Sequence, residues 1–151
     1  MNLIEKELYL VEKMIKADVV KEKSIKEIYK YIFKSDGKKI RARLNLISSS
    51  INRKKKNRIK LAAIIELLHT ATLVHDDVVD DSSFRRGNES VNNIWSNAHG
   101  VLIGDYIYSK AFIYMVDVGK KEILKELASA TNDISQGELI QLDAINNQEI
   151  T

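Results

Sequence analysis

The sequence lacks cysteine and proline altogether. Without cysteine, the chain has no disulfide framework, no thiolate metal site and no cysteine nucleophile, which suits a reducing compartment. Without proline, it lacks the residue that most strongly interrupts helices. The absence of proline fits long, uninterrupted helices.

Long apolar runs and a strong charge imbalance are also missing. No stretch is apolar enough to span a bilayer, and charged residues interrupt positions 1–18, unlike in a signal peptide. The formal net charge is only +3, and basic residues do not alternate with aromatics as on a nucleic-acid surface. We therefore expect a soluble, cytoplasmic protein with no nucleic-acid partner. Its 151 residues, 44% of them hydrophobic, can bury the core of one domain.

Apolar residues recur at helical spacing along most of the chain, and this pattern predicts an all-α fold. Ser24 is a suitable N-cap, Gly37 suits a left-handed helix end, and Gly119 ends a later helix. Gly100 and Gly104 permit close packing between helices. No strand pair or internal repeat is evident. The expected helices span about 3–17, 25–33, 40–47, 59–80, 98–117 and 121–146.

Two of these helices have a predicted apolar side. In the helix 98–117, the inward-facing residues are expected to be Val101, Leu102, Ile107, Ala111, Phe112 and Met115. In the helix 121–146, they are Ile123, Leu124, Leu127, Ile134, Leu139 and Leu142. Both helices are therefore predicted to pack against a core.

A basic stretch separates two of the expected helices and contains Arg53, Lys54, Lys55, Lys56 and Arg58. We interpret it as a solvated connector, and attraction to an anionic membrane surface is the alternative. Further along, the polar segment 82–91 is expected to be a loop that folds over a site.

That site is indicated by a cluster of carboxylates, Asp76, Asp77 and Asp80, at the end of the helix 59–80. Positions i and i+4 lie on one helix face, so Asp76 and Asp80 project together, with Asp77 beside them. Clustered carboxylates repel one another unless a cation neutralises them. Mg²⁺ takes one or two carboxylates, keeps several waters and completes its shell with phosphate oxygens. Arginine is a preferred phosphate ligand, so Arg85 and Arg86 nearby complete the pattern of a diphosphate–Mg²⁺ site.

An Asp-rich patch is, by itself, more typical of a solvated helix end. Here, however, an apolar helical segment leads directly into the carboxylates, so they end a helix that is expected to be buried. The apolar residues of that segment are Ile64, Ile65, Leu67, Leu68, Ala71, Leu73 and Val74. This context favours a binding site over a solvated end.

Several motifs resemble, in the same order, signatures of the trans-polyprenyl diphosphate synthase family, most closely its bacterial octaprenyl type. Residues 37–41, GKKIR, are similar to the GGKRxRP motif. Residues 66–80, ELLHTATLVHDDVVD, resemble the helix leading into the aspartate-rich motif DDxxD, and residues 85–87 resemble the RRG that follows. Residues 104–106, GDY, and 137–142, GELIQL, resemble two later helix signatures. The resemblance covers nearly the whole chain after Lys34 and implies the all-α isoprenoid synthase fold.

The resemblance also implies an activity and roles for residues. The family condenses isopentenyl diphosphate with an allylic diphosphate to make a medium- or long-chain polyprenyl diphosphate for isoprenoid and quinone side-chain synthesis, with Mg²⁺ as cofactor. It implies that Asp76 and Asp80 ligate Mg²⁺ with Asp77 in support, and that Arg85 holds the allylic diphosphate. The residues implied to hold isopentenyl diphosphate are Lys38, Arg41, His69 and Arg86.

Each implied role has a plainer alternative. His69 alone on an apolar helix is more typical of a core histidine, and Lys38 and Arg41 alone are typical of surface charges. Cations at a helix start are disfavoured by the helix dipole, which supports an anionic ligand there. Ala71 and Thr72 stand about one turn, roughly 5.4 Å, before Asp76. A bulky aromatic there limits product length in the family, so these small residues imply an open tunnel, although small residues are also common on packed faces.

The chain departs from the family in its early motif and in its length. Asp36 and Lys39 replace a glycine and an arginine, and Ala42 stands where a proline is usual. The second aspartate-rich motif, which the family has in its C-terminal half, is absent after Gln141. We therefore expect residues 1–151 to form a single polyprenyl synthase-like domain, truncated before that motif. Its site is completed by a C-terminal half or in a homodimer, or the chain is a non-catalytic helical subunit or remnant that only binds a partner.

The sequence resembles a second class of enzymes more weakly. His69 and the pair His75-Asp76 resemble part of the metal site of HD phosphohydrolases, which are also helical. Those enzymes need an earlier histidine on another helix, and no histidine precedes His69 in this sequence. A chain that lacks half of a helical bundle is also expected to expose an apolar face, and hence to oligomerise.

Overall fold

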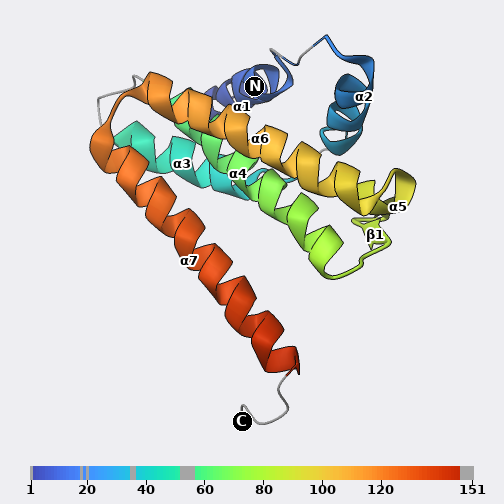
Figure 1. The fold of residues 1–151 in the computed structure, drawn as a ribbon. Coiled ribbons are helices and arrows are strands. Elements are labelled where there is room, and N and C mark those ends of the chain that lie inside the picture. Colours follow the sequence, from blue (N-terminus) through green and yellow to red (C-terminus); the bar gives the residue numbers. More distant parts are fainter. Residues whose placement is uncertain (1, 18, 20, 35–36, 52–56, 147–151) are drawn as a thin grey trace. The chain divides into compact units, whose positions relative to one another are not determined.

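The computed structural model describes residues 2–17, 19, 21–34, 37–51 and 57–146, and α-helices dominate it (Figure 1). The prediction of an all-α fold is confirmed, and each of the expected helices is present. The helices are α1 (Leu3–Lys16), α2 (Lys23–Ile32), α3 (Ile40–Ile51), α4 (Arg58–Val79), α5 (Val91–Ile94), α6 (Asn97–Val118) and α7 (Lys121–Asn146), and the strands are β1 (Phe84–Arg85) and β2 (Asn88–Glu89).

The chain divides into two compact units, Met1–Val118 and Gly119–Thr151. Gly119 has a φ of 66°, so it ends α6 in the left-handed region as predicted. In the described residues, the second unit contains α7. On its predicted apolar side, Ile134, Leu139 and Leu142 are 49%, 63% and 42% exposed, whereas Ile123, Leu124 and Leu127 are half-buried. None of the described helices is long and apolar enough to cross a membrane.

The core of the first unit lies between α4 and α6, which run side by side (Figure 1). A Cβ atom on Gly100 would lie 2.6 Å from Cγ2 of Val78, and one on Gly104 would lie 2.2 Å from Nε2 of His75. Both distances are far below van der Waals contact, so only glycine lets the helices approach this closely. The predicted close packing at these two glycines is therefore confirmed.

The buried face of α6 is offset from the predicted one. Ile107, Ala111 and Met115 are buried, as predicted. The prediction was wrong for Val101, Leu102 and Phe112, which are 43%, 68% and 47% exposed. Buried positions recur three or four residues apart, so these three side chains fall on the other side of the helix. The buried stripe includes Gly100, Ile103, Gly104, Ile107, Ala111, Met115 and Val118.

Helix α1 is joined to the start of α4 by a buried ion pair. Nη2 of Arg58 donates to Oε1 of Glu7, and the two residues are only 4% and 7% exposed. The prediction of a solvated connector was therefore wrong for Arg58, because this residue begins α4 and contacts α1. Asn57, also part of the predicted connector, is the N-cap of α4, and the rest, 53–56, lies outside the described residues.

The start of α2 also differs from the prediction. The N-cap of α2 is Glu22, which makes no side-chain capping bond, so Ser24 lies inside the first turn rather than at the N-cap. Helix α1 has the cap that α2 lacks, because the side chain of Asn2 accepts a hydrogen bond from N of Glu5 at 2.9 Å. A serine near a helix start thus did not identify the capping position.

A short β-hairpin follows α4 directly. Phe84 pairs with Glu89 and Arg85 with Asn88, which leaves Arg86 and Gly87 as a two-residue loop. Their φ values of 52° and 80° match a type I′ turn. The prediction that no strand pair exists was wrong, and so was the prediction of a loop over all of 82–91. The usual Asn-Gly or Asp-Gly signal of this turn is missing, because an arginine occupies its first position.

Candidate functional site

The predicted site residues that α4 carries lie on three of its faces, whereas Lys38 and Arg41 lie just before and at the start of α3, and Arg85 and Arg86 come from the hairpin. Side chains three, four or seven residues apart share a helix face, so His69, Thr72, Asp76 and Asp80 align on one face. Glu66, Thr70 and Asp77 align on the adjacent face. The remaining face packs on α6 and includes Ala71, which is fully buried.

The three carboxylates have different environments. Asp77 is buried and accepts a hydrogen bond from Nε of Arg85 at 2.6 Å. Burial raises the pKa of Asp77, while the hydrogen bond and charge of Arg85 oppose that rise. Asp76 is half-buried, and Asp80 is exposed at the C-cap of α4. Asp77 therefore serves an internal ion pair, whereas Asp80 is exposed to solvent on the face that it shares with Asp76.

This pair of carboxylates fits a hard divalent cation only in part. Among the described residues, no group of three or more His, Cys, Asp or Glu side chains is placed to hold a metal ion. Mg²⁺, however, needs only one or two protein carboxylates when waters and phosphate oxygens fill its other positions. The donor set therefore fits a cation that arrives together with a phosphorylated ligand.

A cationic cluster surrounds His69. The pKa of His69 is lowered to about 4, first by burial and then by the positive charges of Arg41, Arg86 and Arg85. These arginines come from α3 and from the hairpin, so the fold brings together residues that are separated in the sequence. Burial first, and then the three guanidinium groups, oppose protonation of the imidazole, so it is neutral near pH 7.

The start of α3 reaches this cluster through Gly37. A Cβ atom on Gly37 would lie 2.8 Å from Nη1 of Arg86, so the glycine permits close approach of the hairpin. The predicted left-handed conformation was wrong for Gly37, because the positive φ of this segment belongs to Lys39, at 47°. Lys38 is exposed just before α3. Lys39 forms an ion pair with Glu12 and is directed to α1 instead.

Sequence analysis did not identify Glu66 and Asn92, two residues that support this arrangement. Oε1 of Glu66 accepts a hydrogen bond from N of Ala42 at 3.0 Å, which satisfies one free N–H at the start of α3. Nδ2 of Asn92 donates to the carbonyl oxygens of Asp77 and Ser82, both at 3.2 Å. Glu66 lies within segment 66–80, and the resemblance of this segment to a family motif was the one feature of the sequence that could have identified it.

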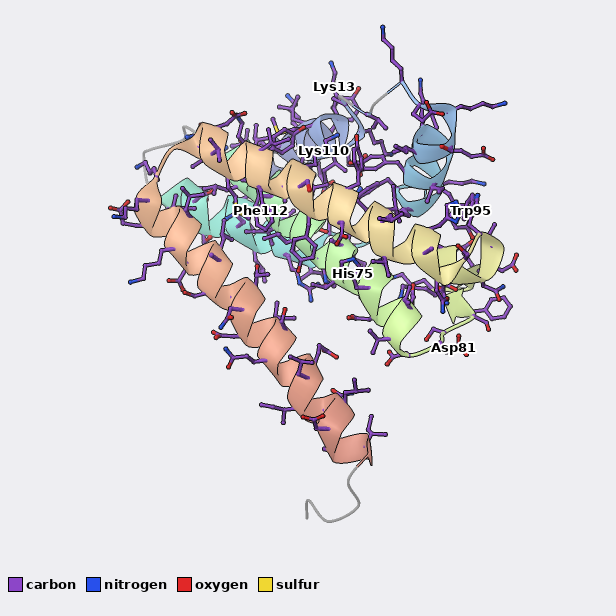
Figure 2. All side chains as sticks on the ribbon, viewed as in Figure 1. Lys13, His75, Asp81, Trp95, Lys110 and Phe112 are labelled. Atoms are coloured by element: carbon purple, nitrogen blue, oxygen red, sulfur yellow. The ribbon has the colours of Figure 1, made fainter. Side chains whose placement is uncertain are left out.

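His75 has a packing role at the contact between α4 and α6 (Figure 2). Its Nε2 lies 3.1 Å from the carbonyl oxygen of Val101 and 3.5 Å from Oδ1 of Asp105. Its ring stacks on Tyr108, with centroids 5.9 Å apart. Burial and the negative charge of Asp76 raise the pKa of Tyr108. Tyr108 thus lies close enough to Asp76 to be affected by its charge, while its ring stacks on His75.

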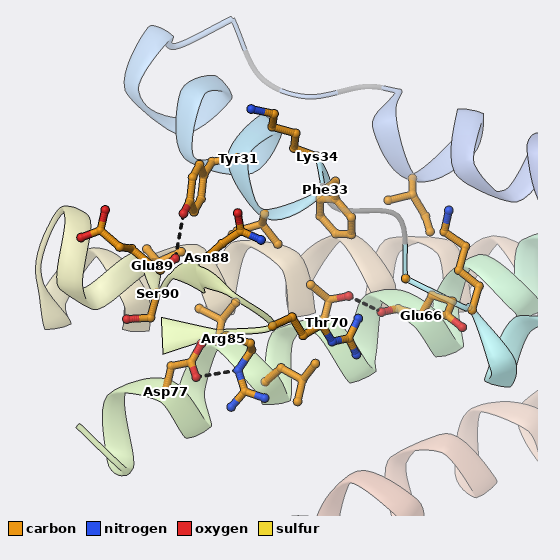
Figure 3. Close-up of a pocket in the computed structure, with 18 residues that line it drawn as sticks. Tyr31, Phe33, Lys34, Glu66, Thr70, Asp77, Arg85, Asn88, Glu89 and Ser90 are labelled. Atoms are coloured by element: carbon orange, nitrogen blue, oxygen red, sulfur yellow. Dashed lines mark hydrogen bonds and ion pairs between the residues drawn. The ribbon is translucent and has the colours of Figure 1, made fainter. Parts of the chain in front are cut away.

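A pocket of about 310 Å³ opens on the adjacent face of α4 (Figure 3). Gly37, Arg85 and Arg86 line it together with Glu66 and Asp77. Its lining does not include the remaining predicted site residues, Lys38, Arg41, His69, Ala71, Thr72, Asp76 and Asp80. Arg85 and Arg86 therefore line this pocket and also lie near His69.

Known proteins resemble the chain over most of its length. Octaprenyl diphosphate synthase from Escherichia coli (strain K12) is 39% identical over 128 residues, which cover 84% of this chain and 40% of that protein. All-trans-nonaprenyl-diphosphate synthase (geranyl-diphosphate specific) from Rhodobacter capsulatus is 40% identical over 129 residues, with the same coverage of 84% and 40%. The chain thus spans about 40% of the length of these relatives.

The fold is shared with solved structures. A polyprenyl synthase from Caulobacter crescentus CB15, complexed with calcium and isoprenyl diphosphate, superposes with a TM-score of 0.92 at 32% identity, over 99% of this chain and 46% of that one. Heptaprenyl diphosphate synthase from Staphylococcus aureus gives a TM-score of 0.90 at 26% identity, over 100% of this chain and 48% of that one. The family described as polyprenyl synthetase matches residues 22–151. This chain therefore belongs to the polyprenyl synthetase family and has the all-α fold of its isoprenoid synthases.

Proposed function

We propose that this chain is the N-terminal part of a Mg²⁺-dependent trans-polyprenyl diphosphate synthase. The proposed reaction condenses isopentenyl diphosphate with an allylic diphosphate to a medium- or long-chain polyprenyl diphosphate. Family membership and the printed names of the relatives support this reaction class. Because the chain spans about 40% of those relatives, the complete reaction is assigned to this chain together with a complementing part.

The observation that carries the proposal is the cationic cluster around His69, on the helix face that also carries Asp76 and Asp80. Arg41, Arg85 and Arg86 lie close enough to His69 to lower its pKa. Such like charges repel one another, and within the described residues Arg41 and Arg86 have no ion-pair partner. A diphosphate would relieve this repulsion, since arginine binds its oxygens in a forked geometry.

In this proposal the acidic residues have unequal roles. Asp76 and Asp80 hold Mg²⁺ together with the diphosphate of the allylic substrate. When bound, the metal supplies Lewis-acid neutralisation of the departing diphosphate. Asp77 acts through Arg85, because its 2.6 Å hydrogen bond orients the guanidinium that would hold the allylic diphosphate.

The remaining basic residues are assigned to the second substrate. Lys38, Arg41, His69 and Arg86 would hold the diphosphate of isopentenyl diphosphate. Glu66 orders the start of α3 by accepting from N of Ala42, which fixes the helix that carries Arg41. The apolar residues of α4 that precede Asp76 keep water from the allylic cation, and this protection is needed because water would otherwise capture the cation.

Product length is proposed to depend on the two small residues of α4 before Asp76. Thr72 lies on the face of Asp76, half-buried, and its Oγ1 donates to the carbonyl oxygen of His69 at 2.8 Å. Ala71 is fully buried on the α6 side. A larger residue at Thr72 would therefore block growth directly, whereas one at Ala71 would act by displacing α6.

We further propose that residues 1–151 are one domain, truncated before the second aspartate-rich motif, and that a C-terminal half or a homodimer completes it. An alternative role is that of a non-catalytic helical subunit or remnant that only binds a partner. The exposed apolar stripe of α3 favours an association of either kind. Its residues are Ile40, Leu44, Ile47 and Ile51, which are 55%, 62%, 50% and 85% exposed.

The test is incubation of the purified chain with Mg²⁺, farnesyl diphosphate and labelled isopentenyl diphosphate, with chromatography of the products and parallel binding measurements. We expect Mg²⁺-dependent binding of farnesyl diphosphate, and long prenyl products once a complementing half is added. Asp76→Ala should abolish this binding with unchanged helix content. Unaltered Mg²⁺-dependent binding in Asp76→Ala would refute the metal-site assignment, and neither turnover nor binding would favour the non-catalytic role.

A further inference from the structure

Helix α1 has two sides that differ in exposure. Leu8, Val11 and Ile15 are buried at spacings of three and four residues, so they form one stripe, and α1 contacts α3 and α4. Side chains at the same spacings on the opposite side are exposed, and we call them the outer face of α1. They are Leu3, Lys6, Tyr9, Leu10, Lys13 and Lys16. Lys13 marks this face in Figure 2.

The acidic residues of α1 do not offset the lysines of the outer face. Each of them is paired with a cation from another part of the chain. The pairs are Glu5–Arg43 at 2.6 Å, Glu7–Arg58 and Glu12–Lys39. Lys6, Lys13 and Lys16, in contrast, have no ion-pair partner among the described residues. The outer face therefore carries three positive charges that no described carboxylate pairs with.

Apolar side chains lie beside these lysines. Leu3, Tyr9 and Leu10 are 54%, 61% and 44% exposed. Exposed side chains of this size are stabilised by any contact that removes them from water. The outer face thus combines positive charge with apolar surface.

A hollow of about 530 Å³ adjoins one edge of the outer face. Leu10 of α1 and Ile59 of α4 line it, as do Lys13 and Lys60. Lys60 is paired with Asp117 at 3.1 Å, so the unpaired charge at the hollow comes from Lys13. The apolar edge of α1 therefore continues onto α4, next to a lysine that is open to an anion.

This combination matches the interface of an anionic lipid bilayer. Lysine side chains lay their apolar stems along the acyl boundary while their ammonium groups reach the lipid phosphates, and tyrosine is favoured at the headgroup level. A nucleic-acid duplex offers phosphates but no apolar phase for Leu3 and Leu10. A stable protein partner needs about 800 Å² of this chain, and the outer face of a 14-residue helix, about 21 Å long, falls short of that area.

We propose that the outer face of α1 docks the chain on an anionic lipid bilayer. Its lysines contact the lipid phosphates, and Leu3, Tyr9 and Leu10 rest at the boundary of the acyl chains. The helix lies along the surface in this arrangement and does not cross the bilayer. The proposal goes beyond the proposed synthase function and does not depend on it, because no residue of the outer face is assigned to a substrate or to Mg²⁺.

The test is co-sedimentation of the purified chain with vesicles of phosphatidylcholine alone or mixed with phosphatidylglycerol. We expect binding to the mixed vesicles to be at least about tenfold tighter than to neutral ones and to weaken as salt screens the lysines. Equal binding to both kinds of vesicle, or no binding to the mixed ones, would overturn the proposal. Equally tight binding to a DNA duplex would show a general attraction of polyanions and would overturn it as well.

A charge variant locates the contact. Lys6→Glu with Lys13→Glu should weaken binding to the mixed vesicles at least about tenfold, and the corresponding double change to Gln should weaken it less. The matched control is Lys121→Glu with Lys125→Glu on α7, because both lysines are exposed and the change in net charge is the same. Unchanged binding in the α1 variant, or equal losses in the two Glu variants with matching helix content, would refute the docking face.

An apolar variant tests the other half of the contact. Leu3→Gln with Leu10→Gln should weaken binding at low and at high salt, since contact with the acyl boundary is not screened by ions. Its control is Leu139→Gln with Leu142→Gln on α7, where the side chains are 63% and 42% exposed. If the α1 variant keeps its vesicle binding but changes the oligomeric state in ultracentrifugation, the face joins copies of this chain and the proposal is overturned.

The docking face and the diphosphate site can fail independently. Both α1 variants should keep Mg²⁺-dependent binding of farnesyl diphosphate, and Asp76→Ala should keep its binding to the mixed vesicles. Loss of vesicle binding in Asp76→Ala, with unchanged helix content, would place the lipid contact at the diphosphate site and refute the assignment to α1.

Discussion

The two ends of α4 both carry an arginine–carboxylate pair, yet the pairs differ in their surroundings. At the first end, Arg58 pairs with Glu7 of α1, and their side chains are 5% and 9% exposed. At the other end, Asp77 pairs with Arg85 of the hairpin, and the Arg85 side chain is 33% exposed. The first pair is enclosed by the fold, whereas the second lies at a surface with further charges around it.

This difference separates a structural ion pair from a site for a ligand. No further ion-pair partner reaches the Glu7–Arg58 pair among the described residues, and its leftover atoms, Oε2 of Glu7 and Nη1 of Arg58, are buried without a hydrogen bond in that part of the chain. Around Asp77 and Arg85, by contrast, the carboxylates of Asp76 and Asp80 and the arginines near His69 add charge of both signs. Such an arrangement is stabilised when a ligand and a cation bind to it.

Breaking the enclosed pair should have the largest effect on stability. Arg58→Met leaves the carboxylate of Glu7 buried without its partner, and we expect a loss of about 3–5 kcal/mol in the free energy of unfolding. Urea denaturation followed by circular dichroism measures this loss. The control is the double variant Glu7→Leu with Arg58→Met, which should return to within about 1 kcal/mol of wild type because it removes both charges. A single variant as stable as wild type would show that the pair is not enclosed in solution.

Breaking the pair of Asp77 and Arg85, in which only Arg85 is partly exposed, should cost far less. Asp77→Asn keeps a hydrogen-bond acceptor for Arg85 and removes a charge whose burial raises the pKa of Asp77. We therefore expect the free energy of unfolding to change by only about 1 kcal/mol. The same variant should weaken Mg²⁺-dependent binding of farnesyl diphosphate, since Arg85 loses the group that orients it. Denaturation and binding are measured on one preparation, with Asp133→Asn, an exposed aspartate of α7, as the control. If Asp77→Asn lost as much stability as Arg58→Met, the ion pairs at the two ends of α4 would not differ as predicted.

Much of the fold follows from apolar periodicity, and the misses have local causes. Helix α6 was predicted with nearly correct bounds, but its inner face was misassigned at Val101, Leu102 and Phe112. A helix that is apolar on nearly all sides has no clear stripe in its sequence. The partner helix α4 decides which side is buried, and its contact centres on Gly100 and Gly104.

The candidate site could be predicted where a motif places its residues on one helix, as with Asp76 and Asp80. The supporting contacts could not be predicted, because they join segments far apart in the sequence. The Glu66 bond to Ala42 spans 24 residues, and the Glu7 bond to Arg58 spans 51. In the sequence alone, Arg58 cannot be distinguished from the other basic residues of its stretch. Only its position at the start of α4, facing α1, distinguishes it from a solvated residue.

The pH dependence of His69 gives the most sensitive test of the ligand-binding end. Burial and the charges of Arg41, Arg86 and Arg85 lower the pKa of His69 from its ordinary 6.5 to about 4. As the pH falls, the unfolded chain therefore takes up this proton first, so the stability contributed by His69 is present above pH 6.5 and is lost between 6.5 and 4. A bound diphosphate neutralises the arginines and favours the imidazolium, so the pKa of His69 should rise on binding.

Histidine ring resonances titrated by NMR with and without isopentenyl diphosphate measure this shift, and the ring of the exposed His99 provides an internal reference. A pKa near 6.5 for His69 in the free chain would show that the arginines do not gather around it. A low pKa that stays unchanged at saturating isopentenyl diphosphate would place this ligand elsewhere. The two ends of α4 would then differ only in their exposure to solvent. The arginines near His69 would repel one another, and no bound anion would neutralise them.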